Sequence, residues 1–466
     1  MLKLWLFTDT HLYCRESPPE KEPDHDQKTL LESGPILDAA LRDFLAAPDC
    51  DILLIAGDIT CNGHADEHRA LIPKLRRVQA AGKRVILITA THDYGQTKPG
   101  DTNPTGLPPL ARPEGKVYRH ELRGLYDEFG FSDAIAHYDA DGGMSYVAQL
   151  APAHPGESAD SPGTPGVRLL CLNDDGDGRA FCGYDEPHMR WILAQIEQAK
   201  AQGEILLGMT HHPSLPPSPI YPLFSPRDML GDWANATRRL ADAGLRCMFT
   251  GHTHMLNIAD TATPAGSRYW DVNTSSLVGY PGVFRVIELE GRHMKVTTRV
   301  VEGIDWDLGG LPLREYLKRH FDFLLRSIIE SAAGDIHRLA VHAKGFSVEK
   351  ETIYRLRLPI TIAGKFVNRV TLGGVGALLL CRRKVPKSVR KHSMKELFLE
   401  LVRNIYGGEE HYAPDTPIGQ SLLAFAARAN FFLKKKLAGG PIENLPAFLE
   451  SLIYDPTPDD YLEIDL

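Results

Sequence analysis

The chain has 466 residues, of which 43% are hydrophobic and 24% are charged, so it is long enough for two or three globular domains. Its seven cysteines include no CxxC pair, which argues against a disulfide framework and a cysteine zinc site and fits a reducing, cytoplasmic setting. No apolar run approaches the roughly 20 residues of a membrane-spanning helix, so we expect no membrane span.

Strands and helices alternate over the first part of the chain. Buried strands are predicted at Leu2–Phe7, Ile52–Ala56, Val85–Ile88, Val167–Leu172, Glu204–Met209 and Arg246–Thr250. Helices are predicted between them at Ile36–Leu45, Glu67–Ala81, Asp185–Gln202 and Trp233–Ala243. This order is typical of parallel sheets with right-handed crossovers. Antiparallel strands are predicted next, at Tyr269–Val272, Val283–Glu288 and Met294–Val301.

The second part of the chain differs in charge. Residues 1–310 carry 29 Lys and Arg against 42 Asp and Glu, a net charge of −13, whereas residues 311–466 carry 23 against 18, a net charge of +5. This change of sign supports a domain boundary, and we predict domains over residues 1–308 and 309–466. The second is predicted to be mostly helical, with helices at Leu313–Ile329, Met394–Ile405 and Gln420–Lys436 and a more strand-like segment at Tyr354–Val370.

Polar residues follow the predicted parallel strands, at the sheet edge where ligands bind in open α/β folds. Asp58 follows Ile52–Ala56 and Gly57, and taken alone it fits a helix N-cap as well as a ligand. Single histidines are usually satisfied core or surface residues, and we assign His64, His68, His188 and His212 to that group. The strand-end candidates are Asp9, His11, Asp58, His92, His211, His252 and His254.

The number and chemistry of these side chains indicate a metal centre. Carboxylate and imidazole ligands together suit Zn, Mn or Fe better than Mg or Ca. Because the ligands are too many for one tetrahedral ion, we predict two divalent transition-metal ions about 4 Å apart, bridged by one carboxylate. Asp58, which follows the central strand, is the natural bridge.

Five blocks, in this order, resemble the signature of the calcineurin-like metallophosphoesterases. They are Asp9-x-His11, Gly57-Asp58, Thr91-His92-Asp93, His211-x-Pro213 and Gly251-His252-x-His254, and the resemblance covers roughly residues 1–305. The stretch Gly57–Gly63 is most similar to the bacterial branch that includes cyclic-nucleotide phosphodiesterases. The resemblance implies the family's α/β fold, a two-sheet sandwich flanked by helices (αββα), here followed by a mostly helical C-terminal domain.

The resemblance also implies a role for each matching residue. The first metal would be held by Asp9, His11, Asp58 and His254, and the second by Asp58, His211 and His252. His92 matches the histidine that faces the leaving group, with Asp93 or another carboxylate tuning it. Where the family normally has Asn as a further ligand of the second metal, this chain has Thr91, so we expect the second ion to be held less tightly.

The function implied by the resemblance is hydrolysis of a phosphate mono- or diester. A hydroxide bridging the two metals would attack phosphorus, with His92 and Asp58 as catalytic residues. The alternative is a non-catalytic binding or scaffold module of the same fold with a weakened second metal site. Because six of the seven expected ligands are present, we favour the enzyme.

Two further features concern what the protein contacts. The long Gly- and Pro-rich segments Gly95–Pro113 and Ala151–Gly166 are expected to help select the substrate. Residues 382–395 contain seven Lys and Arg and no acid. For this basic stretch we favour a solvated face, or one docked against the acidic first domain, over contact with a nucleic acid or an anionic surface.

Overall fold

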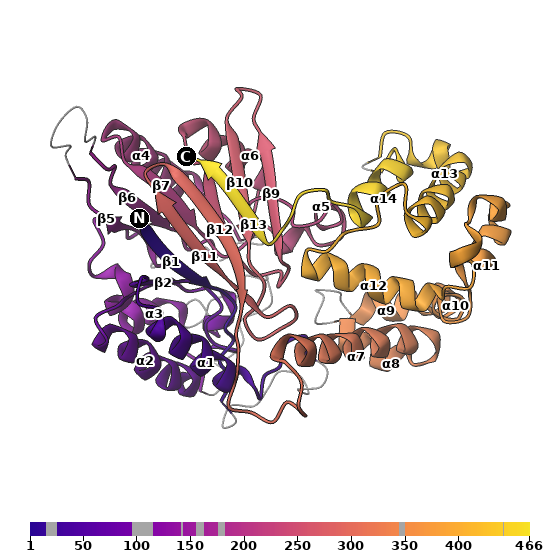
Figure 1. Cartoon of the computed structure of the whole chain (residues 1–466), viewed down its shortest axis with the longest axis horizontal. Coiled ribbons are helices and arrows are strands. Elements are labelled where there is room, and N and C mark those ends of the chain that lie inside the picture. The colour runs from indigo at the N-terminus through magenta and orange to yellow at the C-terminus, as the bar shows by residue number, and fades with distance from the viewer. Residues whose placement is uncertain are drawn as a thin grey trace.

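Figure 1 shows the computed structural model of the chain, with two β-sheets and their covering helices on one side and a group of helices on the other. The structure describes residues 1–14, 26–95, 115–140, 143–154, 163–175, 182–343, 350–440 and 442–466. The two segments expected to select the substrate, 95–113 and 151–166, lie largely or partly outside these residues.

The first sheet has six strands in the order β13-β12-β11-β1-β2-β3. Its parallel part consists of β1 (Leu2–Phe7), β2 (Ile52–Ala56) and β3 (Arg84–Ile88). The antiparallel part consists of β11 (Val283–Glu290), β12 (His293–Val300) and β13 (Tyr461–Asp465). All five residues of β2 are buried, which fits the prediction of a strand covered on both faces.

The second sheet has seven strands in the order β4-β5-β6-β7-β8-β10-β9. Its parallel part consists of β6 (Val167–Cys171), β7 (Ile205–Met209), β8 (Cys247–Thr250) and β10 (Arg268–Asn273). The antiparallel strands at its two ends are β4 (Ala136–Tyr138), β5 (Ser145–Ala151) and β9 (Asn257–Ala262). These three strands were not predicted from the sequence.

Helices cover the outer faces of the two sheets (Figure 1). Helices α1 (Ser33–Ala46), α2 (Ala65–Ala80) and α3 (Arg119–Tyr126) accompany the first sheet, and α4 (Glu186–Ala201), α5 (Tyr221–Phe224) and α6 (Trp233–Ala243) belong to the second half. One core includes Leu54 of the first sheet with Leu207 and Phe249 of the second. A separate core joins Leu170 to Ile192 and Leu240 on the covering helices. The predicted αββα sandwich is therefore confirmed.

The chain beyond the sheets is helical, as predicted. Its helices are α7 (Leu313–Gly334), α8 (Ile336–Ala343), α9 (Lys350–Arg355), α10 (Arg357–Val367), α11 (Leu372–Leu378), α12 (Met394–Gly407), α13 (Pro417–Leu437) and α14 (Leu445–Ile453). Among the described residues no helix is long and apolar enough to cross a bilayer.

The prediction that Tyr354–Val370 is strand-like was wrong, because this segment forms α9 and α10. Helix α10 packs closely on α7: a Cβ atom at Gly364 would lie 2.5 Å from the carbonyl carbon of Ala332. The Asn368 side-chain amide donates a hydrogen bond to the carbonyl of Ile329, at 3.1 Å. This tertiary packing outweighs the strand preference of the Ile, Thr and Val residues in the segment.

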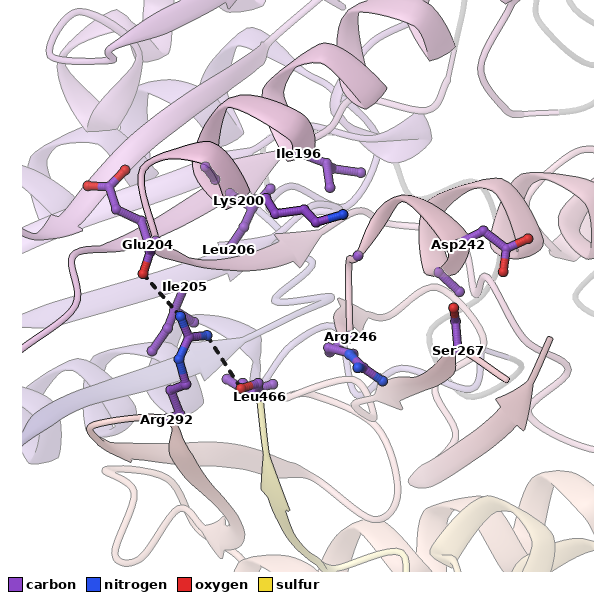
Figure 2. Close-up of a pocket in the computed structure, with 14 residues that line it drawn as sticks. Ile196, Lys200, Glu204, Ile205, Leu206, Asp242, Arg246, Ser267, Arg292 and Leu466 are labelled. Atoms are coloured by element: carbon purple, nitrogen blue, oxygen red, sulfur yellow. Dashed lines mark hydrogen bonds between the residues drawn. The ribbon is translucent and has the colours of Figure 1, made fainter. Parts of the chain in front are cut away.

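The end of the chain returns to the first sheet as β13 (Figure 1). Figure 2 shows the Arg292 guanidinium, which donates to the carbonyl oxygens of Gly203, at 3.1 Å, and Leu466, at 3.4 Å. The surrounding hollow of about 380 Å³ lies at the amino ends of β7 and β8, where Ile205 and Arg246 line it. Ligands bind at the opposite, carboxyl ends of such strands. The predicted division near residue 308 stays a prediction, although the last strand of the chain belongs to the first sheet.

Candidate metal centre

The predicted Asp and His ligands follow four strands at one edge of the sandwich. Asp9 and His11 follow β1, Asp58 follows β2, His211 follows β7, and the pair His252 and His254 follows β8. The turns after β1 and β2 are held together by backbone hydrogen bonds, from the Asp9 amide to the carbonyl of Gly57 and from the His11 amide to that of Asp58. The parallel sheets thus bring together side chains that are up to 245 positions apart in the sequence.

The backbone at these positions is strained. Asp9, His11, Asp58, His252 and His254 all have positive φ angles, between 38° and 69°. Among the described residues only two other non-glycine residues, Asp232 and Leu380, have a positive φ angle. Positive φ is unfavourable for residues with a Cβ atom, and such conformations cluster at ligand sites where the surrounding structure enforces them. Five of the six predicted Asp and His ligands therefore carry a backbone feature that is rare in the rest of the described chain.

A first cluster is formed by Asp9, His11 and His254, all of them buried. The Nε2 atoms of His11 and His254 lie 3.0 Å apart, and Asp9 Oδ1 lies 3.6 Å from the former and 3.2 Å from the latter. Asp9 Oδ1 makes no hydrogen bond to any described residue, and neither does His254 Nδ1. A buried carboxylate oxygen without a donor is costly, and a cation at this point would satisfy it.

A second cluster is formed by Asp58, His211 and His252. Asp58 Oδ2 lies 3.1 Å from His211 Nε2, and His252 Nδ1 lies 3.3 Å from the same nitrogen. Asp58 Oδ2 also lies 4.0 Å from Nε2 of His11, which belongs to the first cluster. This one oxygen atom therefore faces both clusters, as the predicted bridging role requires.

Backbone carbonyls fix the tautomers of two histidines. The Nδ1 atoms of His11 and His211 lie 3.4 Å and 2.8 Å from the carbonyl oxygens of Thr60 and Ala56. A carbonyl only accepts hydrogen bonds, so Nδ1 carries a proton in both rings and Nε2 is the atom that faces the centre. Burial opposes protonation of His211, but the charges of Asp58 and Asp9 raise the pKa of His211 well above its ordinary value, so its Nε2 must give up a proton when it binds a metal. Carbonyl contacts of this kind orient histidine ligands in metal sites.

The electrostatics of the centre favour ionised carboxylates beside imidazoles. Burial opposes ionisation of Asp58, but the nearby His211 and His92 outweigh it and hold the pKa of Asp58 well below its usual range. Burial likewise opposes ionisation of Asp9, but the nearby imidazoles, His211 first among them, hold the pKa of Asp9 well below its usual range. Burial, helped by the charge of Lys28, lowers the pKa of His11 to about 3, so its ring is neutral. Two buried carboxylates and several imidazole nitrogens are a donor set suited to divalent transition-metal ions.

Gly57 leaves the space in which the second cluster forms. Its φ angle is +87°, and an added Cβ atom would lie 2.7 Å from both the Ala90 Cβ atom and His211 Nδ1. No side chain fits there without moving His211, a predicted ligand. The glycine after β2 is therefore required both by the left-handed turn and by the close approach of His211.

His92 lies at the edge of the centre, on the turn after β3. Its ring centroid is 4.9 Å from that of His11, and its backbone amide donates to Asp58 Oδ1 at 2.9 Å. Its Nδ1 atom lies 2.6 Å from the carbonyl oxygen of Cys61. The carbonyl of Cys61 sets the tautomer and orientation of His92, whose side chain is partly exposed.

The expectation that Asp93 tunes His92 is not supported by its contacts. The carboxylate of Asp93 accepts hydrogen bonds from the amides of Thr60 and Ala90, each at 2.8 Å, and from the Thr60 hydroxyl at 3.0 Å. Asp93 is therefore engaged in tying the turn after β3 to the turn after β2. Thr91 begins the short 3-10 turn over residues 91–93, directly before His92. Its predicted part in holding the second metal stays a prediction.

A third cluster, of Asp174, Cys182 and His212, was not predicted as a unit. Asp174 accepts hydrogen bonds from the His212 amide at 2.7 Å, from the Thr210 hydroxyl at 2.8 Å and from His212 Nδ1 at 2.9 Å. The ring of His212 packs against that of His252, with centroids 4.0 Å apart. His212 is thus a satisfied core histidine, as predicted, and it supports a ligand of the second cluster. The sequence signal for this third cluster was the position of Asp174, which follows β6 at the same sheet edge.

Comparison with known proteins establishes the family. The sequence model of the calcineurin-like phosphoesterases matches residues 2–256, which is more than half of the chain. The chain therefore belongs to the calcineurin-like phosphoesterase family. The curated proteins give no match.

Solved structures show distant similarity. A dimetal phosphatase from Danio rerio is 14% identical with a TM-score of 0.45, and the match covers 67% of this chain and 98% of that one. A purple acid phosphatase from yellow lupin (Lupinus luteus) seeds is 11% identical with a TM-score of 0.39, covering 64% of this chain and 51% of that one. A phosphopantetheinyl hydrolase from Mycobacterium tuberculosis is 18% identical with a TM-score of 0.29, covering 59% and 89%.

Proposed function

We propose that this chain is a dinuclear-metal phosphoesterase that hydrolyses a phosphate mono- or diester. The observation that carries the proposal is Asp58 Oδ2, which faces His211 at 3.1 Å and His11 at 4.0 Å and so lies between two Asp/His clusters. Family membership supports the same class of reaction. The seven cysteines, none of them in a disulfide bond in the described part of the chain, support a cytoplasmic setting.

The two clusters fit two ions of Mn, Zn or Fe. Asp9, His11 and His254 would hold the first ion and His211 and His252 the second, with Asp58 between them and Thr91 near the second. Bound ions would supply Lewis-acid activation of a water nucleophile and neutralise charge on the phosphoryl oxygens. The orphaned Asp9 Oδ1 and the two carbonyl-fixed imidazoles are the features that fit this role.

His92 is proposed to handle the proton of the leaving group. Its Nδ1 atom is engaged with the carbonyl of Cys61, so Nε2 is the atom that takes up and passes on a proton. His92 is partly exposed whereas the ligands of the first cluster are buried, so it can contact a substrate that enters from solvent. A positioned imidazole of this kind lowers the barrier to expulsion of an alkoxide.

The experiment is hydrolysis by the full chain after loading with Mn²⁺ or Zn²⁺. The substrates are an aryl phosphomonoester, an aryl phosphodiester and a cyclic nucleotide, the last because Gly57–Gly63 resembles the bacterial phosphodiesterase branch. We expect turnover that a chelator abolishes and added metal restores. Asp58→Asn should lower the rate of hydrolysis about a hundredfold or more. Asp51 is an exposed residue just before β2, and Asp51→Asn should keep the wild-type rate. A metal-free, inert wild type would favour the scaffold alternative.

A further inference from the structure

The helical region contains two long stretches without any acidic residue. From residue 352 to residue 395 there are eleven Lys and Arg and no Asp or Glu. From residue 416 to residue 442 there are four Lys and Arg, again without an acid. The two stretches include α10, α11 and α13, which Figure 1 shows at the end of the molecule away from the sheets.

The basic side chains of the first stretch are presented to solvent. Arg382, Arg383, Lys384, Lys387 and Lys391 are exposed, and none has an ion-pair partner among the residues that the structure describes. By contrast, Lys395 pairs with Glu330 at 2.6 Å. Of the two favoured alternatives, these exposed side chains fit the solvated face and do not fit docking against the acidic first domain.

Large apolar side chains are exposed beside these charges. Leu378, the last residue of α11, and Leu380, two residues beyond it, are 67% and 78% exposed. Phe431 and Phe432 on α13 are 71% and 61% exposed. Isolated exposed apolar residues are common in soluble proteins, but a group of four large ones beside unpaired cations marks an interaction site.

The end of α11 and the aromatic pair of α13 are joined to one another on a packed support. The Arg428 side chain donates to the carbonyl of Leu379 at 3.1 Å, and its guanidinium carbon lies 5.0 Å from the centre of the Phe432 ring. It thereby links the end of α11 to the aromatic pair of α13. Beneath them, Leu372, Val385 and Phe425 share one buried core. We call Leu378, Leu380, Phe431, Phe432 and the cations Arg382, Arg383, Lys384, Lys387 and Lys391 the basic–apolar surface.

The chemistry of this surface selects among partners. A nucleic acid would neutralise the cations and could stack on the phenylalanines, but it offers nothing to the exposed leucines. A second copy of the same surface would bring like charges together. An anionic lipid bilayer accepts both kinds of group, because its headgroups attract Lys and Arg while Leu and Phe insert at the acyl boundary.

We propose that the basic–apolar surface docks this protein on membranes that contain anionic lipids. The cations provide attraction to the headgroups, and the four apolar side chains provide shallow insertion. Because the described helices include no membrane span, this attachment is peripheral and reversible. The proposal is independent of the activity of the metal centre.

The test is co-sedimentation of the full chain with vesicles of equal parts phosphatidylglycerol and phosphatidylcholine, and with vesicles of phosphatidylcholine alone. We expect binding to the anionic vesicles only, weakening as NaCl is raised from about 50 mM to about 500 mM. Phe431→Ser/Phe432→Ser and Arg382→Gln/Arg383→Gln/Lys384→Gln should each lower the partition coefficient about tenfold or more.

The matched control is Arg77→Gln/Arg190→Gln/Arg299→Gln, which removes three charges from exposed positions of the first part of the chain. It should bind within about twofold of the wild type, and unfolding midpoints verify that every variant is folded. Failure of the wild type to bind anionic vesicles overturns the proposal. A control variant whose partition coefficient falls as much as that of the surface variants overturns it too. Binding to single-stranded RNA, or self-association, that the surface variants abolish while vesicles are not bound would assign the surface to that partner instead.

Discussion

Gly57→Ala is the substitution whose effect on the metal centre follows most directly from the structure. The new methyl group would lie 2.7 Å from His211 Nδ1, the atom that contacts the carbonyl of Ala56 at 2.8 Å. It would also force alanine into a φ of +87°. The turn must therefore open or His211 must move, and either change separates His211 from Asp58.

Gly82→Ala is the matched control, because Gly82 has a similar φ of +80° but nothing within 4 Å of an added Cβ atom. The left-handed conformation alone should cost about 1–2 kcal/mol, which is the whole effect expected at Gly82. At Gly57 the overpacking adds about 1–3 kcal/mol. We therefore expect Gly57→Ala to lower the free energy of unfolding by about 2–5 kcal/mol, clearly more than Gly82→Ala.

Urea unfolding gives the free energies, and calorimetric titration with Mn²⁺ or Zn²⁺ gives the metal affinities. Gly57→Ala should weaken binding of the ion held by His211 about ten- to a hundredfold, while Gly82→Ala should bind both ions like the wild type. Equal destabilisation by the two substitutions, with wild-type metal affinity in both, would refute the reasoning that Gly57 makes room for His211.

Three further predictions concern single side chains. Thr91→Asn should raise the affinity for the second metal equivalent about ten- to a hundredfold in the same titration. Equal affinities of the wild type and Thr91→Asn for that equivalent would mean that another ligand already compensates for Thr91. His92→Gln should slow hydrolysis of an alkyl phosphate ester about a hundredfold or more at unchanged metal content, and an unchanged rate would exclude His92 as the proton donor. Burial raises the pKa of Asp459 to about 7, above its unfolded value of about 3.9, so its contribution to stability is complete below about pH 4 and is lost as the pH rises through about 7. Asp459→Asn keeps an acceptor for the Ile258 amide and should be more stable than the wild type above about pH 8, on the order of 2–4 kcal/mol by urea unfolding, with no difference below about pH 4.

The sequence predicted that the candidate ligands would meet because each follows a short apolar run that is buried as a parallel strand. Ile52–Ala56 and Trp233–Ala243 have the predicted bounds. Once the strands are parallel, their carboxyl ends share one edge, and Asp9, Asp58 and His211 must meet there. The proximity of Asp58 Oδ2 to both clusters is the structural counterpart of the predicted bridge.

Features that depend on contacts between distant segments were not predictable in this way. Strand β13 pairs with β12 across more than 150 residues of chain, and its short sequence carries no sign of a partner. Tyr354–Val370 has strand-like composition, and only packing of Gly364 against Ala332 makes its helical form understandable. Asp93 is adjacent to His92 in sequence, but its carboxylate is engaged by Thr60 and Ala90.

The central claim is that this chain holds two metal ions with Asp58 between them, and counting the ions tests it most directly. The full chain would be loaded with Mn²⁺ or Zn²⁺, separated from free metal and analysed for metal content, beside Asp58→Asn treated in the same way. The account predicts two ions per wild-type chain and at most one in Asp58→Asn, because the bridging charge is lost. A wild type that retains no ion, or an Asp58→Asn variant that retains two with unchanged affinity, would contradict it.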